Sequence, residues 1–218
     1  MTDALASPAP ARARDREQTT ARILAAVGEA LSAEGFAGIG VNSVARRAGV
    51  DKVLIYRYFG GLPQLLEAWG RSGAFWPTVN DVLGPDREAF LALPLAERYG
   101  RFLEHFIDAL RARPLTLEVL AQELIERNEL TAILESEREA WGREAAAVLG
   151  GHDYAHVPGA QGITILLIAG VEYLLLASRK IRVFGGFDLR SDDGWAALKA
   201  DVRAMTRTWL APQSPRAE

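Results

Sequence analysis

Apolar residues recur every three or four positions through most of the chain, which is the period of an α-helix with one buried face. In residues 16–33 this stripe consists of Ile23, Leu24, Val27 and Leu31, and it predicts a first helix. No segment alternates apolar and polar residues as a strand does, and the sequence holds no internal repeat. The pattern therefore predicts an all-α protein.

Glycine and proline residues divide the rest of the chain into further predicted helices. One starts near Gly61, carries its apolar stripe as far as Trp76 and stops at Pro77. The stretch that follows, with Gly84 and Pro94, is expected to be an irregular connection. Helical spacing then covers residues 95–113, 114–128, 129–149, 157–180 and 192–210, with a loop near 150–159.

Two short predicted helices, 41–48 and 51–58, are separated by a glycine turn. Gly49 is expected to end the first helix, because a residue without a Cβ takes positive φ at little steric cost. Asp51 is expected to cap the second helix by accepting a hydrogen bond from a backbone N–H at its start. The spacing turns inward Val44, Ala45 and Ala48. This arrangement is that of a helix-turn-helix.

The second short helix has one apolar and one polar face. Ile55 and Phe59 lie four residues apart on the face that packs, while Lys52 and Tyr56 share an outer face suited to a DNA groove. The alternative is that Tyr56 and Tyr58 only pack beside the first helix. We expect DNA contacts from Arg46, Arg47, Lys52, Val53, Leu54, Tyr56, Arg57 and Tyr58.

With its flanking residues, this stretch resembles the N-terminal domain of the TetR/AcrR family of transcriptional regulators. The matching pieces are ARILAAVGEALSAEGF at 21–36, VNSVARRAGVDKVLIYRYF at 41–59 and LPQLLEAW at 62–69. Gly40 stands where the family usually has a Ser or Thr that caps the helix and touches phosphate, and Leu62 where a Lys is common. Both differences remove contacts to the DNA backbone, so we expect lower nonspecific affinity than is usual for the family.

The pattern and the resemblance together predict a three-helix helix-turn-helix domain followed by a larger helical domain. The N-terminal tail is rich in Ala and Pro and lacks an apolar period. Arg12, Arg14 and Arg16 are candidates to enter a minor groove, the alternative being a solvated tail. The predicted parts are a disordered tail at 1–15, the DNA-binding domain at 16–61, an effector-binding and dimerisation domain at 62–212 and a C-terminal tail at 213–218.

Charge is distributed unevenly along the 218 residues, which carry a net charge of −3. Residues 1–62 hold 8 Lys and Arg against 6 Asp and Glu, and the remainder holds 17 against 22. The positive part coincides with the helix-turn-helix, so overall acidity does not exclude DNA binding.

The last two predicted helices indicate how the chain assembles. Residues 157–180 are apolar all around, which predicts burial on more than one side. Large residues of 192–210 follow spacings of three and four, as in bundle packing. Two such helices from each of two chains make a four-helix interface, which the resemblance also implies; the alternative is a purely intrachain core. The expected interface residues are Ile163, Leu167, Leu174, Trp195, Leu198, Val202, Met205 and Trp209.

Glu172 is a carboxylate within an apolar helix face, and burying it is costly unless it is paired or hydrogen-bonded. We expect it to meet Arg179, to bond across to another helix or to contact a cationic or hydroxylated ligand. The aromatic residues of the larger domain suit an apolar or amphipathic ligand, although each could be ordinary core. The candidate effector-binding residues are Trp76, Tyr99, Phe102, Phe106, Trp141 and Glu172.

Other kinds of chemistry find little support. The chain has no cysteine, phosphate loop or G-x-S-x-G motif, so we predict no enzyme and no cofactor, with an all-α enzyme as a remote alternative. His152 and His156 have a metal-ligand spacing, with Asp153 between them, but glycines and prolines flank them, and we predict no metal site. We find no signal peptide, and the longest apolar run, 163–177, falls short of the roughly 20 residues that span a bilayer.

These inferences predict a soluble, cytoplasmic transcriptional regulator with no membrane partner. The family resemblance implies a repressor that binds a palindromic operator in double-stranded DNA as a homodimer and is released by a small apolar or amphipathic effector. The alternative within binding proteins is a regulator of the same fold without a small-molecule effector.

Overall fold

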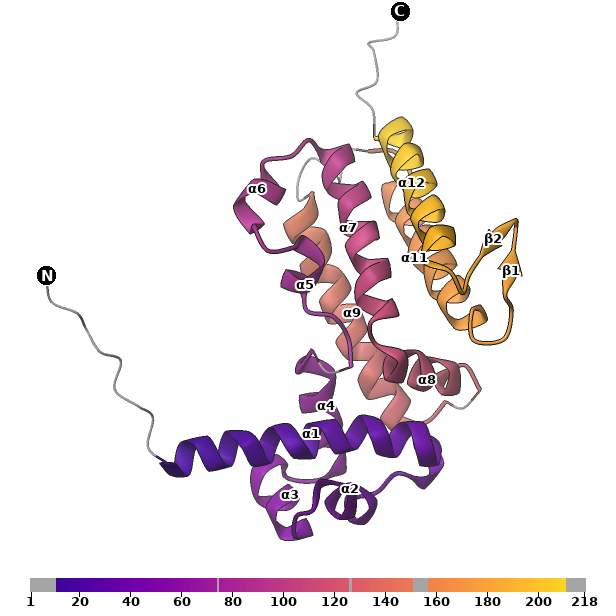
Figure 1. The fold of residues 1–218 in the computed structure, drawn as a ribbon. Helices are drawn as coiled ribbons and strands as arrows, with labels where there is room; N and C mark the ends of the chain where they lie inside the picture. Colours follow the sequence, from indigo (N-terminus) through magenta and orange to yellow (C-terminus); the bar gives the residue numbers. More distant parts are fainter. Residues whose placement is uncertain (1–10, 74, 126, 151–156, 211–218) are drawn as a thin grey trace, which may run out of the picture.

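The structure, a computed structural model, describes residues 11–73, 75–125, 127–150 and 157–210. Helices make up most of these residues, which confirms the predicted all-α class. Figure 1 shows two parts, a small N-terminal domain and an upright helical bundle above it. The N-terminal domain consists of α1 (Ala11–Gly38), α2 (Val41–Ala48) and α3 (Lys52–Phe59).

The larger domain is organised around α7 (Leu95–Arg111), which α5, α8, α9, α11 and α12 contact. Its first helix, α4 (Leu62–Arg71), stands on the N-terminal domain (Figure 1). The other elements are α5 (Val79–Leu83), α6 (Arg87–Leu91), α8 (Pro114–Glu123), α9 (Glu129–Leu149), α11 (Ala160–Ala177), β1 (Val183–Phe184), β2 (Phe187–Asp188) and α12 (Asp192–Trp209).

The helix-turn-helix forms as its sequence predicts. Gly49 has φ 64°, and its N–H bonds back to carbonyls of the last turn of α2. Asp51 caps α3, because its Oδ1 accepts a hydrogen bond of 2.8 Å from the Val53 N–H. Val44 and Ile55 are completely buried between the helices. The glycine turn and the buried faces of α2 and α3 therefore determine the orientation of α3.

Two predicted helix boundaries were wrong. The first helix begins at Ala11 and not at residue 16, because residues 11–15 consist mainly of Ala and Arg, which are good helix formers. The helix predicted to reach Trp76 ends at Arg71, where Gly73 takes φ 72° in the following turn. Trp76 therefore lies beyond α4, although it is buried.

Three other segments differ from expectation. The predicted connection contains α5 and α6, whose starts are capped by Thr78 and Asp86. The predicted helix 114–128 ends at Glu123. Strands β1 and β2 form an antiparallel hairpin, although no strand was predicted. Each strand is two residues long, too short to show alternation, and the turn depends on positive φ at Gly185 and Gly186.

Helix α4 connects the cores of the two domains. It packs against α1 and α3 on one side and α9 on another. Leu65, Leu66 and Trp69 are almost fully buried along it. At its end, Arg71 makes a forked hydrogen bond to the Glu137 carboxylate of α9, with distances of 2.9–3.0 Å. A displacement of α4 therefore changes the packing in both domains.

Helix α11 leaves much of its apolar surface uncovered. Within the described residues, it is the one helix that is long and apolar enough to cross a membrane by length and composition alone. Only Ala160, Val171 and Leu175 are buried, while Leu166 is 73% exposed. Within a single chain the other described helices cover only one of its faces, so burial on more than one side would need a second molecule and stays a prediction.

A glycine pair tests the backbone argument for the turn. Gly49→Ala should lower the free energy of unfolding by about 1–2 kcal/mol, because a Cβ is strained at positive φ although it would meet no atom within 4 Å. Gly142→Ala, inside α9 with equally open space, should raise it by about 1 kcal/mol. Urea denaturation of both variants checks this, and a loss of stability of the same size in both would contradict the role of φ.

Candidate nucleic-acid interface

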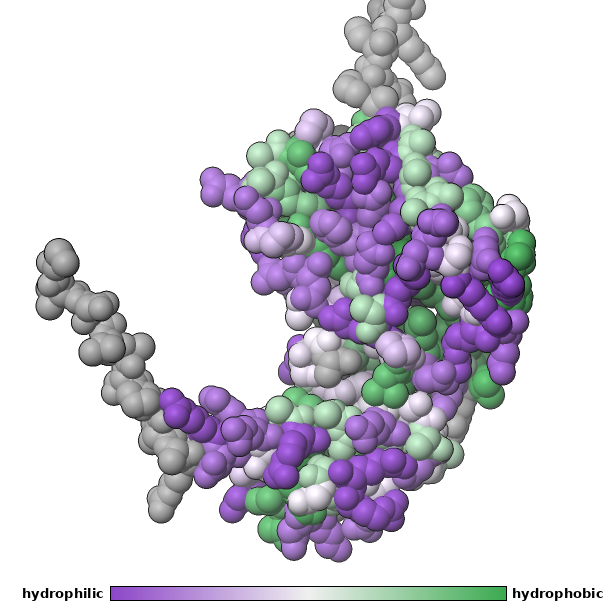
Figure 2. Space-filling model, in the orientation of Figure 1, coloured by the Kyte–Doolittle hydropathy of each residue, from purple (hydrophilic) through white to green (hydrophobic). Residues whose placement is uncertain are grey.

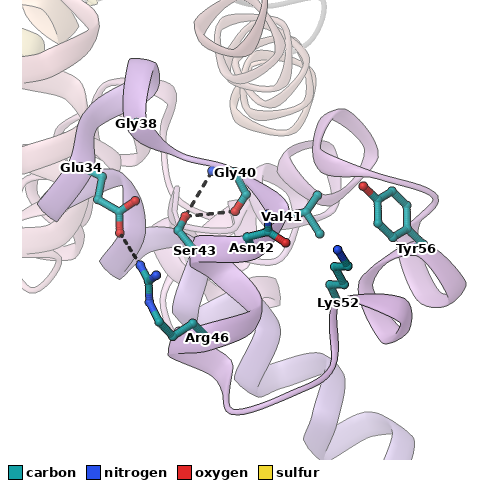
Figure 3. Close-up of a pocket in the computed structure, with 9 residues that line it drawn as sticks. All are labelled: Glu34, Gly38, Gly40, Val41, Asn42, Ser43, Arg46, Lys52 and Tyr56. Atoms are coloured by element: carbon teal, nitrogen blue, oxygen red, sulfur yellow. Dashed lines mark hydrogen bonds and ion pairs between the residues drawn. The ribbon is translucent and has the colours of Figure 1, made fainter.

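An open groove of about 520 Å³ lies on the N-terminal domain, where the start of α2 meets α3 and the end of α1. Figure 3 shows Lys52 and Tyr56 of α3 pointing toward the start of α2. The groove has a largely polar lining, so hydrogen-bond donors of α2 and α3 are accessible to the anionic backbone of a nucleic acid. The groove is lined by Glu34, Gly38, Gly40, Val41, Asn42, Ser43, Arg46, Lys52 and Tyr56.

The start of α2 is held by a serine inside the helix. The Gly40 N–H donates to the Ser43 hydroxyl at 3.1 Å, and this hydroxyl donates to the Gly40 carbonyl at 3.0 Å. The first backbone N–H groups of a helix have no intrahelical acceptor and suit a phosphate. Ser43 therefore does part of what a capping side chain at position 40 would do, but its hydroxyl is buried and committed to this bond.

Helix α3 presents the predicted outer face. Lys52, Val53 and Tyr56 are exposed, and Ile55 on the opposite side is fully buried. Leu54 is half-buried, so it offers less apolar surface than an exposed leucine would. The face therefore combines an ammonium, a phenol and an apolar side chain at its accessible positions.

The two arginines of α2 have different surroundings. Arg47 donates to the Glu34 carboxylate of α1 at 2.9 Å, and its side chain is 30% exposed. Arg46 lies 3.7 Å from the same oxygen and is much more exposed. The Arg47 hydrogen bond lowers the pKa of Glu34, so the carboxylate stays ionised at neutral pH. Arg46 is the freer of the two, while Arg47 ties α2 to α1.

Arg57 and Tyr58 form a small cluster with the first helix. The guanidinium of Arg57 lies 5.2 Å from the Tyr58 ring centroid, and that of Arg16 lies 5.1 Å from it. Tyr58 is half-buried, as in the alternative in which it packs beside the first helix, whereas Arg57 stays exposed. The Tyr58 ring therefore positions the guanidinium groups of Arg16 and Arg57 at the edge of the candidate DNA-binding surface.

The groove also brings in Asn42, which the sequence reasoning missed. This exposed amide stands in the first turn of α2, beside the helix end that suits a phosphate. A hydrogen-bonding residue two positions after Gly40 is the signal that could have identified it.

The comparisons with known proteins agree with this geometry. Residues 23–69 match the family described as "Bacterial regulatory proteins, tetR family". This segment is a DNA-binding domain of the TetR family type. The chain is thus a DNA-binding transcriptional regulator, and the matched residues cover α2 and α3 completely.

Relatives extend the similarity beyond the matched segment. The chain is 26% identical over 198 residues to the HTH-type transcriptional repressor SCO4008 of Streptomyces coelicolor, covering 88% of this chain and 97% of the relative. Its fold is similar to that of the fatty acid degradation regulator FadR from Bacillus halodurans, with TM-score 0.62, 18% identity and coverage of 98% of this chain and 100% of the other. A putative TetR-family regulator from Rhodococcus sp. matches with TM-score 0.60, 21% identity and coverage of 89% and 100%.

In the larger domain, four of the predicted effector residues gather into one aromatic cluster. The Trp76 ring lies 5.7 Å from Phe106 and 5.8 Å from Trp141, between ring centroids. Phe102 stacks on Trp141 at 6.1 Å. Tyr99 is 6.4 Å from Phe102 but also meets Trp209, so it forms the edge of the group.

Of the three partners considered for Glu172, the remaining predicted effector residue, Arg179 is not the one that it meets. Arg179 pairs with Glu118 of α8 instead. The Glu172 carboxylate is influenced by Arg138 of α9, but burial dominates and raises its pKa. Glu123 at the end of α8 pairs with Arg138 at 2.6 Å, yet burial raises the pKa of Glu123 to about 7. Two partly desolvated carboxylates thus share one arginine.

The predicted assembly residues divide into three groups by their burial within one chain. The structure corrects the assignment of Trp195 and Val202, which are 2% and 7% exposed within one chain because α12 packs on α7. Met205 remains exposed on α12. The half-buried members pack partly against their own chain, and they are Ile163, Leu167, Leu174, Leu198 and Trp209.

No described residues form a cluster of three or more metal-ligating side chains. The predicted absence of a metal at His152, Asp153 and His156 concerns residues outside those that the structure describes.

Replacing Lys52 tests the DNA surface. Lys52→Ala should weaken DNA binding. If the ammonium contacts a phosphate, the slope of log K against log salt concentration should fall by about one unit. If it contacts a base, the binding free energy should weaken by about 1–3 kcal/mol, with relaxed specificity at that base position. The fold should be unchanged, because the side chain is exposed. Arg143→Ala, which removes an exposed cation from α9, is the matched control. Equal binding isotherms for both variants over a range of salt concentrations would contradict the assignment.

Proposed function

We propose that this protein is a cytoplasmic repressor and not an enzyme, that it binds a palindromic operator as a homodimer, and that a small molecule in the larger domain releases it. The observation that carries the proposal is the accessible face of α3, with Lys52 and Tyr56 beside the start of α2. The named function of the Streptomyces coelicolor relative supports repression as the mode of action.

The exposed surface of α11 supports the homodimer. Ile165, Leu166 and Tyr173 stand on one uncovered side of the helix and are 59%, 73% and 53% exposed. Because apolar side chains gain free energy when they leave water, a continuous apolar face of this kind favours a partner. A second copy of the chain, related by a two-fold axis, supplies the same apolar face. Burial against this copy explains the apolar helix without requiring a membrane.

Neighbouring elements extend this face. Met205 of α12 is exposed, and small alanines at 197 and 204 on the same helix would let a partner helix approach closely. The hairpin adds Val183 and Phe184, whose ring contacts Tyr173 at 5.7 Å. In Figure 2 hydrophobic residues are visible along the edge where the hairpin stands. The proposed interface is therefore α11, the outer side of α12 and the hairpin.

An aromatic chain offers a route from effector to DNA. Trp69 of α4 lies 4.8 Å from the Phe75 ring, Phe75 lies 5.9 Å from Trp76, and Trp76 belongs to the aromatic cluster. A ligand among these rings would press on α4, which carries the N-terminal domain. It shifts the equilibrium only as far as it binds the released form more tightly than the DNA-bound form.

Selecting bound fragments of the source genome with the purified protein tests the proposed function. We expect enrichment of an inverted repeat whose half-sites lie about one helical turn apart, 10–10.5 base pairs, or a multiple of it. Binding should fall steeply with salt, since phosphate contacts release counterions. Fragments that share no repeat, or binding that salt does not affect, would contradict the proposal.

A charge on α11 tests the dimer. Leu166→Glu should produce folded monomers, because the side chain is exposed in the single chain but would be desolvated without a partner in the interface. Operator binding should weaken by at least about tenfold when half of the contacts are lost. Ala147→Glu, at an exposed position of α9, is the control and should stay dimeric. A dimeric Leu166→Glu in sedimentation would move the interface elsewhere.

A further inference from the structure

The aromatic cluster contains two indole donors that no described residue satisfies. Trp76 is 5% exposed, and its buried Nε1–H has no acceptor in the part of the chain that the structure describes. The Nε1–H of Trp141, whose ring meets Trp76 edge-on, also has none. Native interiors seldom leave buried donors unpaired, so each unpaired donor needs an explanation. An oxygen or nitrogen acceptor on a ligand between the rings would satisfy them.

The same region carries more negative than positive charge. The Glu123 side chain is 9% exposed; one oxygen pairs with Arg138, and the other, Oε1, is buried and has no partner among the described residues. Glu172 forms no hydrogen bond or ion pair with any described residue. Since Glu172 acts electrostatically on both Glu123 and Arg138, the three charges are neighbours. Two carboxylates therefore face one guanidinium.

Arg138 joins these charges to the rings. Its guanidinium carbon lies 5.9 Å from the Trp76 ring centroid, so the carboxylates lie next to the aromatic cluster. Aromatic faces attract cations, most strongly when water is excluded. The excess of carboxylates and the aromatic ring faces therefore both favour a positively charged ligand.

We propose that the effector of this protein is an organic cation with an aromatic or broad apolar body. The body packs against the Trp76 and Trp141 indoles at the side of the cluster that faces Arg138, and the cationic group pairs with Glu172 and the free oxygen of Glu123. An acceptor atom on the body bonds the indole donors. The proposal rests on the proposed function, because it names the chemical class of the ligand that would release the operator.

Other ligand classes fit these charges less well. An anion such as a fatty acid would meet Arg138, but that arginine is already paired, and the second carboxylate would repel it. A neutral apolar ligand would further desolvate Glu172 without compensating its charge. A cation supplies the missing charge, and it would also replace the protons that the raised pKa values of Glu123 and Glu172 favour.

A matched series of probes tests the ligand class. Calorimetry would compare 2-(1-naphthyl)ethylammonium, 2-(1-naphthyl)ethanol and 1-naphthylacetate, which share one aromatic body and differ in charge. We expect the ammonium to bind about ten- to a hundredfold more tightly than the alcohol, the range for a hydrogen bond to a charged group, and the carboxylate to bind least. In Glu172→Gln the preference for the ammonium over the alcohol should fall to about a tenth or less of its wild-type value.

Glu144→Gln is the control, because it removes an exposed carboxylate from α9 and should leave the preference unchanged. Thermal unfolding of both variants verifies that they are folded. If the ammonium does not bind more tightly than the alcohol, including the case in which none of the three binds, or if its preference survives in Glu172→Gln, the proposal is overturned.

Titrating an operator complex with the same probes separates the two proposals. Release by the ammonium, reduced in Glu172→Gln, supports both. Ammonium binding that depends on Glu172 but does not release DNA supports the cation site and contradicts its role as effector site. If the wild-type protein does not bind an operator even without a probe, the proposed function is contradicted. The cation site would be unaffected by that result, because calorimetry measures ligand binding without DNA.

Discussion

The buried side of α4 is the constraint on which the rest of the structure depends. Its leucines and Trp69 belong to the core of the N-terminal domain, yet its other side packs on α9. Gly28 makes this close packing possible, because a Cβ there would lie 2.5 Å from Leu115 of α8 and 3.1 Å from Trp69. The helix-turn-helix therefore has little freedom to move independently of the bundle, and a signal from the bundle can reach α3 through α4 or through the contact of α8 with α1.

The distribution of charge follows from this division of labour. The N-terminal domain keeps exposed cations at Arg46, Lys52 and Arg57, whereas the bundle pairs most of its described arginines with carboxylates, several of them on another helix. Surface pairs of this kind contribute little to stability. They remove unpaired positive charge from the bundle, so the attraction to DNA is concentrated on one surface. Glu172 is the exception, because its burial leaves it without a counter-ion of its own.

The site was predictable where the local sequence decides it. Helical period placed Lys52 and Tyr56 opposite Ile55, and the structure has them so. It could not show that Glu34, 13 residues earlier, holds Arg47, or that Arg16 lies over Tyr58, since these contacts depend on how α1 crosses the turn. In the bundle, composition predicted an aromatic ligand site, and the sequence left the partner of Glu172 open among Arg179, another helix and a ligand. Only the tertiary structure brings the nearby cation from α9.

The sequence by itself determined the helices, the glycine turn and the cap of α3, because these depend on interactions within a few residues. It also determined that α11 is apolar on all sides. Only the tertiary structure decided which of those sides the chain covers, and that Trp195 serves the α7–α12 contact and not an outer seam. Periodicity reports that a side chain must be buried. It carries no information about the surface that buries it, since that surface comes from residues far away in the sequence or from another chain.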